Sequence, residues 1–129
     1  MDLKKITLAI IKKGFTTRIS EHLLSDEVKC KCSYKTCTRT MINIRTIDSF
    51  EKLRNLYGKA IFITSGFRCT THNTDVVGRY GSYHKIGCAL DLVPTDIVDL
   101  DLLEELANKC FDVVIRYNDG FIHCHNVER

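Results

Sequence analysis

The sequence contains no tryptophan, a single proline and only 7 glycines among 129 residues. It also has no internal repeat and no low-complexity stretch. These absences exclude repeat proteins, collagen-like chains and domains joined by a proline-rich linker, because each of those requires a biased composition. Residues 1–129 are therefore predicted to form a single domain.

A long apolar run is also missing. Residues 6–11 (ITLAII) are mostly apolar, but Lys12 and Lys13 follow at once. A run of this length is too short for a transmembrane helix or for the core of a secretory signal peptide. We therefore expect synthesis in the cytoplasm, with no signal peptide and no membrane span, so that action outside the cell requires release of the protein.

Charges of the two signs nearly balance. The 19 Lys and Arg exceed the 16 Asp and Glu by a net charge of +3, which without a concentrated basic face gives no reason to expect a nucleic-acid partner. A hydrophobic content of 44% and a charged content of 27% are typical of a soluble domain. A chain of this length buries enough surface to fold without a disulfide or a structural metal.

The number of cysteines is odd, which does not fit a secreted disulfide scaffold. The 7 cysteines stand at positions 30, 32, 37, 69, 88, 110 and 124. We expect free thiols, because cysteine commonly behaves as a small buried hydrophobe. Cys30, Cys32 and Cys37 are close enough in sequence for a second metal site, but no fourth ligand is obvious, and ordinary packing of a loop is the alternative.

Apolar periodicity predicts helices separated by antiparallel strands. Helices are expected over 46–57 and 99–110, and strands over 59–64, 87–93, 113–117 and 121–125. An Asp119-Gly120 turn joins the last two strands into a hairpin. Residues 26–41 are predicted to be rich in loops, with a short helical turn opening at Ser25, and residues 66–83 to form a long functional connection. The predicted class is α+β, an antiparallel sheet with flanking helices.

Histidines and a carboxylate in the C-terminal half predict a metal site on this sheet. His123 and His125 lie two residues apart on a predicted strand, so their rings share one face. His84 and Asp91 add an imidazole and a carboxylate, and Asp91 stands in the apolar sequence CALDLV, where an unpaired charge costs several kcal/mol. Three ligands of these types, with an open fourth position, are typical of catalytic zinc.

Each of these residues also has an ordinary structural explanation. The alternative for Asp91 is a salt bridge with Arg68 or Arg79. The alternative for His84 is a histidine in a surface loop, and for His125 a solvated residue near the C-terminus. Spacing alone leaves these alternatives open.

Three short motifs follow one another along residues 63–124. The segment Ser82-Tyr-His84-Lys-Ile-Gly87-Cys-Ala89-Leu-Asp91 fits the pattern Ser-x-His-x-x-Gly-x-Ala-x-Asp. Upstream, ITSGFRCTTHN (63–73) is similar to Thr-Ser-Gly-Tyr-Arg-Cys-x-x-His-Asn, and downstream FIHC (121–124) is similar to the strand that supplies the last ligand. In this order the motifs resemble a family of zinc peptidases that includes D-alanyl-D-alanine carboxypeptidases and phage endolysin peptidases, and the hedgehog signalling domain has a related fold. The resemblance covers residues 20–126 and leaves 1–19 as an N-terminal extension.

The resemblance implies roles for individual residues. His84, Asp91 and His123 are implied to be the ligands of one catalytic Zn²⁺. Arg68 is implied to be the substrate-side cation that holds a peptide carboxylate or polarises the scissile carbonyl, a task that suits a permanently charged guanidinium. Its structural alternative is a tie to Asp91 or to a backbone carbonyl. Ser82 is implied to support the substrate site through hydrogen bonding.

The general base is the point at which the motif differs from the family. Related enzymes often place an acid three residues before the last histidine, but position 120 is Gly. Asp119, one residue earlier, is the leading candidate, although an Asp before Gly is also ordinary turn chemistry. His125 is the alternative, because an imidazole near the site can take or give a proton. If neither acts, the protein binds metal without hydrolysing anything.

We therefore predict a monomeric zinc metallopeptidase that hydrolyses peptidoglycan stem or cross-link peptides next to a D-amino acid, as a carboxypeptidase or an endolysin-type endopeptidase. It would act at the cell wall once released. The alternative is a non-catalytic zinc module that binds a peptide or protein on the same fold. Cys69, Cys88 and Cys124 flank residues of the three motifs, so we expect them to pack around the zinc site rather than to form disulfides or bind metal.

Overall fold

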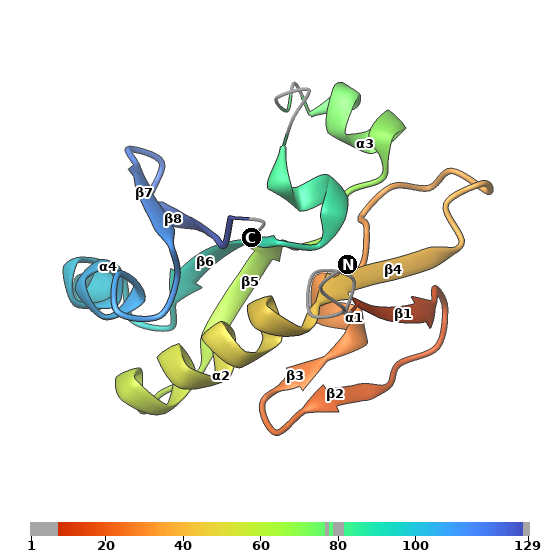
Figure 1. The fold of residues 1–129 in the computed structure, drawn as a ribbon. Coiled ribbons are helices and arrows are strands. Elements are labelled where there is room, and N and C mark those ends of the chain that lie inside the picture. Colours follow the sequence, from red (N-terminus) through yellow and green to blue (C-terminus); the bar gives the residue numbers. More distant parts are fainter. Residues whose placement is uncertain (1–7, 77, 79–81, 128–129) are drawn as a thin grey trace.

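The computed structural model describes residues 8–76, 78 and 82–127 (Figure 1). The helices are α1 (Ser25–Val28), α2 (Ile44–Tyr57), α3 (Thr70–Asp75) and α4 (Leu100–Ala107), with short 3-10 helices η2 (Tyr83–Ile86) and η3 (Ile97–Asp99). The strands are β1 (Leu8–Lys12), β2 (Arg18–Ser20), β3 (Leu23–Leu24), β4 (Arg39–Asn43), β5 (Ile61–Ser65), β6 (Ala89–Pro94), β7 (Val113–Tyr117) and β8 (Phe121–His125). The described strands pair in antiparallel fashion, which confirms the α+β class.

The main sheet has four strands in the order β5-β6-β8-β7. Its central strands β6 and β8 place alternate residues on opposite faces. Leu90 and Leu92 of β6 and Cys124 of β8 belong to the hydrophobic core, together with apolar residues of α2 and α4. Asp91 is paired in register with His123, so these two residues share the other face of the sheet. The alternation of side chains along the strands therefore places the core on one face of the sheet and Asp91 and His123 on the other.

Two smaller sheets, β1–β4 and β2–β3, lie on the side of the molecule away from α4 (Figure 1). Helix α1 packs against β3 and β4 of these sheets and against β5 of the main sheet. The contact is closest at Gly66, where an added Cβ would lie 2.7 Å from the Cα of Val28. The Phe67 N–H also donates to the Val28 carbonyl at 2.9 Å. The segment that follows β5 is therefore held directly against the end of α1.

Gly87 holds the turn after His84 against β4. Its φ of 72° is left-handed, and an added Cβ would lie 2.5 Å from the carbonyl oxygen of Met41. The Gly87 carbonyl accepts hydrogen bonds from the Asn43 N–H at 2.9 Å and from the Thr46 hydroxyl at 3.0 Å. Both the backbone conformation and the close packing therefore require glycine at this position.

Local sequence patterns located most elements of the C-terminal two thirds. The helix predicted over 46–57 is α2, which begins at Ile44 because the Asn43 side chain accepts a hydrogen bond from the Arg45 N–H. The strands predicted over 59–64 and 87–93 are β5 and β6, and the predicted hairpin is β7–β8. The helical turn at Ser25 is α1.

Three expectations were wrong in extent. The helix predicted over 99–110 ends at Ala107. The loop-rich segment 26–41 includes the start of β4, and the connection 66–83 includes α3 and the start of η2. Residues 8–19, for which no structure was predicted beyond their place outside the family resemblance, contribute β1, which pairs with β4, and the first residues of β2. Within the described ranges, no helix has the length and apolar character needed to cross a membrane.

Substitution of Gly87 tests the packing of the His84 turn. Gly87→Ala is expected to destabilise the fold by more than Gly58→Ala, measured as the free energy of unfolding in urea. Both glycines have positive φ, so each alanine incurs a backbone cost of about 1 kcal/mol. Only the Gly87 substitution also forces a clash, because nothing lies within 4 Å of a Cβ at Gly58. Equal losses in the two variants would show that this contact does not constrain the turn.

Candidate metal centre

Three side chains from two strands and a turn converge on the polar face of the main sheet. Asp91 lies in β6, His123 in β8 and His84 in η2. The Asp91 Oδ1 lies 3.2 Å from the His84 Nε2 and 3.0 Å from the His123 Nδ1. The two ring nitrogens are 3.2 Å apart. The structure therefore brings together the three residues that the sequence predicts as metal ligands.

The orientation of the His84 ring is fixed by its second nitrogen. The Nδ1 lies 2.7 Å from the carbonyl oxygen of Gly66, to which an Nδ1–H can donate. This contact favours the tautomer that leaves Nε2 unprotonated toward Asp91 and His123. The Ser82 hydroxyl accepts a hydrogen bond from the His84 N–H at 3.2 Å and so caps the turn. The role of Ser82 toward a substrate stays a prediction.

The His123 ring is held in the same way by His125. The His123 Nε2 lies 2.8 Å from the His125 Nδ1, while the His123 Nδ1 faces Asp91. The His125 ring stacks on Tyr83, with ring centroids 4.1 Å apart. Burial and the neighbouring His123 and His84 lower the pKa of His125, which favours the neutral ring. The Nδ1 of neutral His125 can accept a hydrogen bond from the Nε2–H of His123. The Nδ1 of His123 is then free to bind a metal.

Asp91 is the most heavily engaged residue of the centre. Burial alone would raise its pKa, but the close contacts with His123 and His84 lower the pKa to about 2. Its second oxygen, Oδ2, lies 3.3 Å from the Arg68 guanidinium. Arg68 is itself held by Ser65, whose hydroxyl accepts from Nε at 3.0 Å. The tie between Arg68 and Asp91 that the sequence left as an alternative is present, whereas Arg79 lies outside the described residues.

The geometry fits one tetrahedral metal ion. Zinc–nitrogen bonds of about 2.0–2.1 Å separate tetrahedral ligand atoms by about 3.3 Å. The three ligand atoms lie 3.0–3.2 Å apart. The side chain of His123 is 14% exposed against 2% for His84, so solvent reaches the centre past His123. A fourth position open to water on that side is what a catalytic zinc requires.

The two candidate general bases lie in different surroundings. Asp119 is exposed in the turn between β7 and β8, where the Gly120 N–H donates to the Tyr117 carbonyl at 3.2 Å. His125 contacts the far nitrogen of His123 rather than the nitrogen that faces Asp91. The choice between Asp119 and His125 as base stays a prediction.

The cysteines are distributed differently from our expectation. Cys124 belongs to the core on the opposite face of β8 from His123, and Cys88 is buried beside the His84 turn. Cys69 does not pack at this centre. Its sulfur lies 3.8 Å from that of Cys32, because the fold brings α3 against the loop after α1. All seven cysteines are free thiols.

Some contacts at the centre have no signal in the sequence. The Gly66 carbonyl that orients His84 is a backbone group, and the stacking of Tyr83 on His125 depends on tertiary structure. For Cys69, its place directly after Arg68 in the second motif was a visible signal, but its partner cysteines lie far away in sequence.

The main sheet of this α+β domain carries two histidines and a buried aspartate whose ligand atoms lie 3.0–3.2 Å apart, a set that fits one metal ion. The family model described as Peptidase M15 matches residues 21–125. The chain belongs to this family of zinc-dependent peptidases, which confirms the resemblance seen in its motifs. A comparison with curated proteins finds no match.

Replacing His125 separates a positioning role from a role as base. His125→Ala is expected to weaken zinc affinity by about 10- to 100-fold, because it removes the acceptor that orients His123. Competition with a chromogenic zinc chelator measures this change. His125→Asn is expected to restore part of the affinity, since its Oδ1 can replace the Nδ1 acceptor. Asp119→Ala serves as the control with unchanged affinity. Wild-type affinity in His125→Ala would rule out the positioning role.

Proposed function

We propose that this protein is a zinc-dependent peptidase that hydrolyses peptidoglycan stem or cross-link peptides next to a D-amino acid. The observation that carries the proposal is the convergence of His84, Asp91 and His123 in a chain of the M15 peptidase family. The substrate class comes from the resemblance of the motifs to D-alanyl-D-alanine carboxypeptidases and phage endolysin peptidases, and both cleavage modes remain candidates.

His84, Asp91 and His123 would hold the ion. A bound Zn²⁺ supplies a water of lowered pKa and a Lewis acid for the scissile carbonyl. The protein contributes the orientation of its ligands, through the Gly66 carbonyl on His84 and through His125 on His123. Each of these contacts leaves the other ring nitrogen available to the ion.

Arg68 is the proposed substrate-side cation. Its side chain is 16% exposed, and its guanidinium has N–H groups beyond the one directed at Asp91, because a guanidinium presents five donors. A peptide carboxylate or carbonyl oxygen near the metal is a suitable acceptor for them. The same guanidinium contacts the Asp91 Oδ2 at 3.3 Å, so it would act on the substrate and on the ligand set together.

Asp119 is the proposed general base, and His125 the alternative. Asp119 precedes β8 in an exposed turn, from which a carboxylate can turn toward a bound peptide. His125 is held by Tyr83 and by His123, which favours an orienting role and leaves proton transfer to Asp119. Either residue would take a proton from the attacking water and deliver it to the leaving amine.

A non-catalytic zinc module that binds a peptide or protein is the second candidate. The observation that favours it is Gly at position 120, where related enzymes often carry an acid. Such a module would retain His84, Asp91 and His123 for structure and recognition, and would lack the proton transfer step.

Incubation of the zinc-loaded protein with peptidoglycan peptides tests the proposal. We expect new free amines, detected by mass spectrometry, from peptides with a D-amino acid at the cleaved bond and none from the matched all-L peptides. His84→Ala and Asp91→Ala are expected to lose activity together with the zinc ion of this site. Asp119→Ala is expected to keep zinc and lose activity by about 10²- to 10⁴-fold, the usual contribution of a general base.

The outcomes separate the candidates. Full activity of Asp119→Ala would move the base assignment to His125. A wild-type protein that holds one equivalent of zinc in the histidine site and cleaves no peptide would refute the enzyme and leave the binding module.

A further inference from the structure

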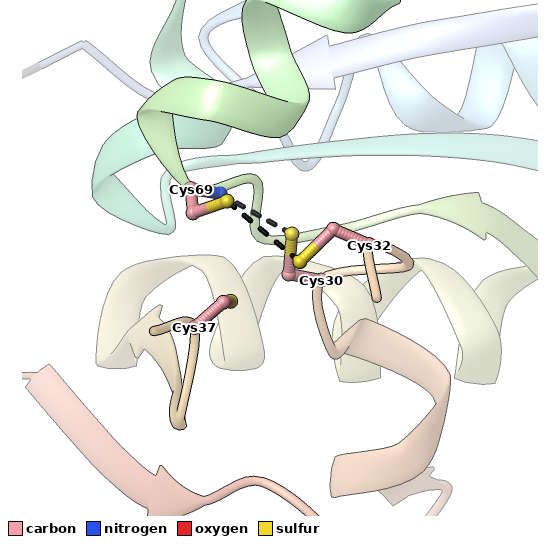
Figure 2. A group of neighbouring side chains, drawn as sticks. All are labelled: Cys30, Cys32, Cys37 and Cys69. Carbon is pink, nitrogen blue, oxygen red and sulfur yellow. Dashed lines mark hydrogen bonds between the residues drawn. The ribbon is translucent and has the colours of Figure 1, made fainter. Parts of the chain in front are cut away.

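Four cysteines form a second group apart from the histidine site. Cys30, Cys32 and Cys37 lie in the loop between α1 and β4, and Cys69 immediately precedes α3. Their sulfur atoms all lie within 4.8 Å of one another. Figure 2 shows the four side chains directed toward a common space from two separate segments of the chain. The fold thus supplies the fourth ligand that the spacing of the first three cysteines lacked.

The spacing of the sulfur atoms suits a single ion. Zinc–sulfur bonds of about 2.3 Å place the sulfurs of a tetrahedral site about 3.8 Å apart. The sulfur of Cys69 lies 3.8 Å from that of Cys32. The upper limit of 4.8 Å for the remaining pairs requires only small shifts of side chains to close on one ion.

Backbone amides already point at two of the sulfurs. The Cys69 N–H donates to the Cys30 sulfur at 3.3 Å, and the His72 N–H donates to the Cys69 sulfur at 3.4 Å. Hydrogen bonds of this kind orient thiolate ligands and offset their negative charge. They do not occupy the space between the four sulfurs.

Lys13 donates hydrogen bonds to the other two sulfurs. Its ammonium donates to the Cys32 sulfur at 3.4 Å and to the Cys37 sulfur at 3.6 Å. A thiolate, and not a thiol, binds metal. Four thiolates around a divalent ion carry a net charge of −2, which the Lys13 ammonium partly offsets.

We propose that Cys30, Cys32, Cys37 and Cys69 bind one structural Zn²⁺ ion. The site has four protein ligands and no open position, which is the form of structural zinc sites and distinguishes it from the histidine site. The cysteines at the cluster are only partly buried, apart from Cys30, and a cavity of about 340 Å³ that borders Cys32 and Cys37 gives the ion a route from solvent.

The arrangement favours one zinc ion over an iron–sulfur cluster and over disulfides. A cluster interposes several irons and sulfides between its cysteines, for which sulfurs all within 4.8 Å of one another leave no room. Soft tetrahedral S₄ sites select zinc among abundant divalent ions. Two disulfides would divide the four cysteines into two pairs. Here each of the four sulfurs accepts a hydrogen bond, and all four face one common space.

The ion would connect the N-terminal part of the fold to the peptidase site. Cys69 follows Arg68 directly, and Cys30 follows the end of α1, where the Val28 carbonyl accepts from the Phe67 N–H. Gly66, which directly precedes Phe67, orients His84 through its carbonyl. A zinc ion that joins the two segments would therefore fix the backbone from which Arg68 and the His84 acceptor extend. This inference concerns a site separate from the catalytic ligands and does not depend on hydrolysis.

Metal analysis of the purified full-length chain, expressed with zinc and kept reduced, tests the proposal. The wild type is expected to hold about two zinc ions per chain, one in each site. Cys37→Ser and Cys69→Ser are expected to hold one, as is His84→Ala, while a variant that combines Cys37→Ser with His84→Ala holds none. Cys110→Ser is the matched control with two ions, because Cys110 lies outside the cluster and its thiol donates to the Leu106 carbonyl.

Cobalt substitution gives a readout that does not depend on the folding of cysteine variants. His84→Ala loaded with Co²⁺ is expected to show intense thiolate-to-cobalt charge transfer and tetrahedral visible bands. The proposal is overturned if these bands are absent, if His84→Ala retains no metal, if iron is the metal bound, or if mass spectrometry of the reduced preparation finds a Cys32–Cys69 disulfide. None of these outcomes bears on cleavage of peptides, so failure of this site and failure of the proposed function are distinguishable.

Discussion

The arrangement of this protein depends on one buried carboxylate. Asp91 sits in the middle of the central strand β6, where an isolated charge would cost several kcal/mol. His84 and His123 contact one of its oxygens and Arg68 the other. These partners come from three other segments of the chain, so satisfying Asp91 requires β8, η2 and the segment after β5 to meet at one point. The same convergence that makes the charge tolerable creates a set of ligands for a metal.

The alternation of β6 and β8 explains how a small domain has room for both a core and a site. Leu90, Leu92 and Cys124 face α2 and α4, while Asp91 and His123 face away from them. The core therefore positions the ligands without contributing to their chemistry. The proposed cysteine site would add a second anchor, at the junction of the N-terminal sheets and the segment that carries Arg68. Packing of Gly66 on Val28 joins the two regions at the same junction.

Local sequence patterns were enough to predict the helices, strands and turns that depend mainly on residues close together in the chain. The periodicity of α2, the buried strand β6 and the Asp-Gly hairpin β7–β8 were predicted with small errors at their ends. The convergence of His84, Asp91 and His123 was also predicted, because an aspartate in an apolar strand and the spacing of His84, Gly87 and Asp91 are visible in the sequence. The pairing of β1 with β4 was not predicted, since it joins segments far apart in sequence and gives no local signal.

The remaining gaps have the same physical cause. Cys69 became the fourth member of the cysteine cluster only through the packing of α3 against the loop after α1. The contact of His125 with the far nitrogen of His123 depends on the side-chain alternation along β8 and on stacking against Tyr83. The general base depends on how a peptide lies in the site, which the spacing of residues does not determine. Sequence patterns thus identified the candidate ligands that converge, and missed most of their non-local partners.

The most direct test of the metal centre is anomalous diffraction at the zinc absorption edge, from crystals of the full chain grown with zinc. We predict an anomalous peak bonded to the His84 Nε2, the Asp91 Oδ1 and the His123 Nδ1, with His125 hydrogen-bonded to the other nitrogen of His123. The account would be contradicted by zinc-saturated crystals without a peak at that position, or with a zinc ion bound through the Nε2 of His123 and the ring of His125.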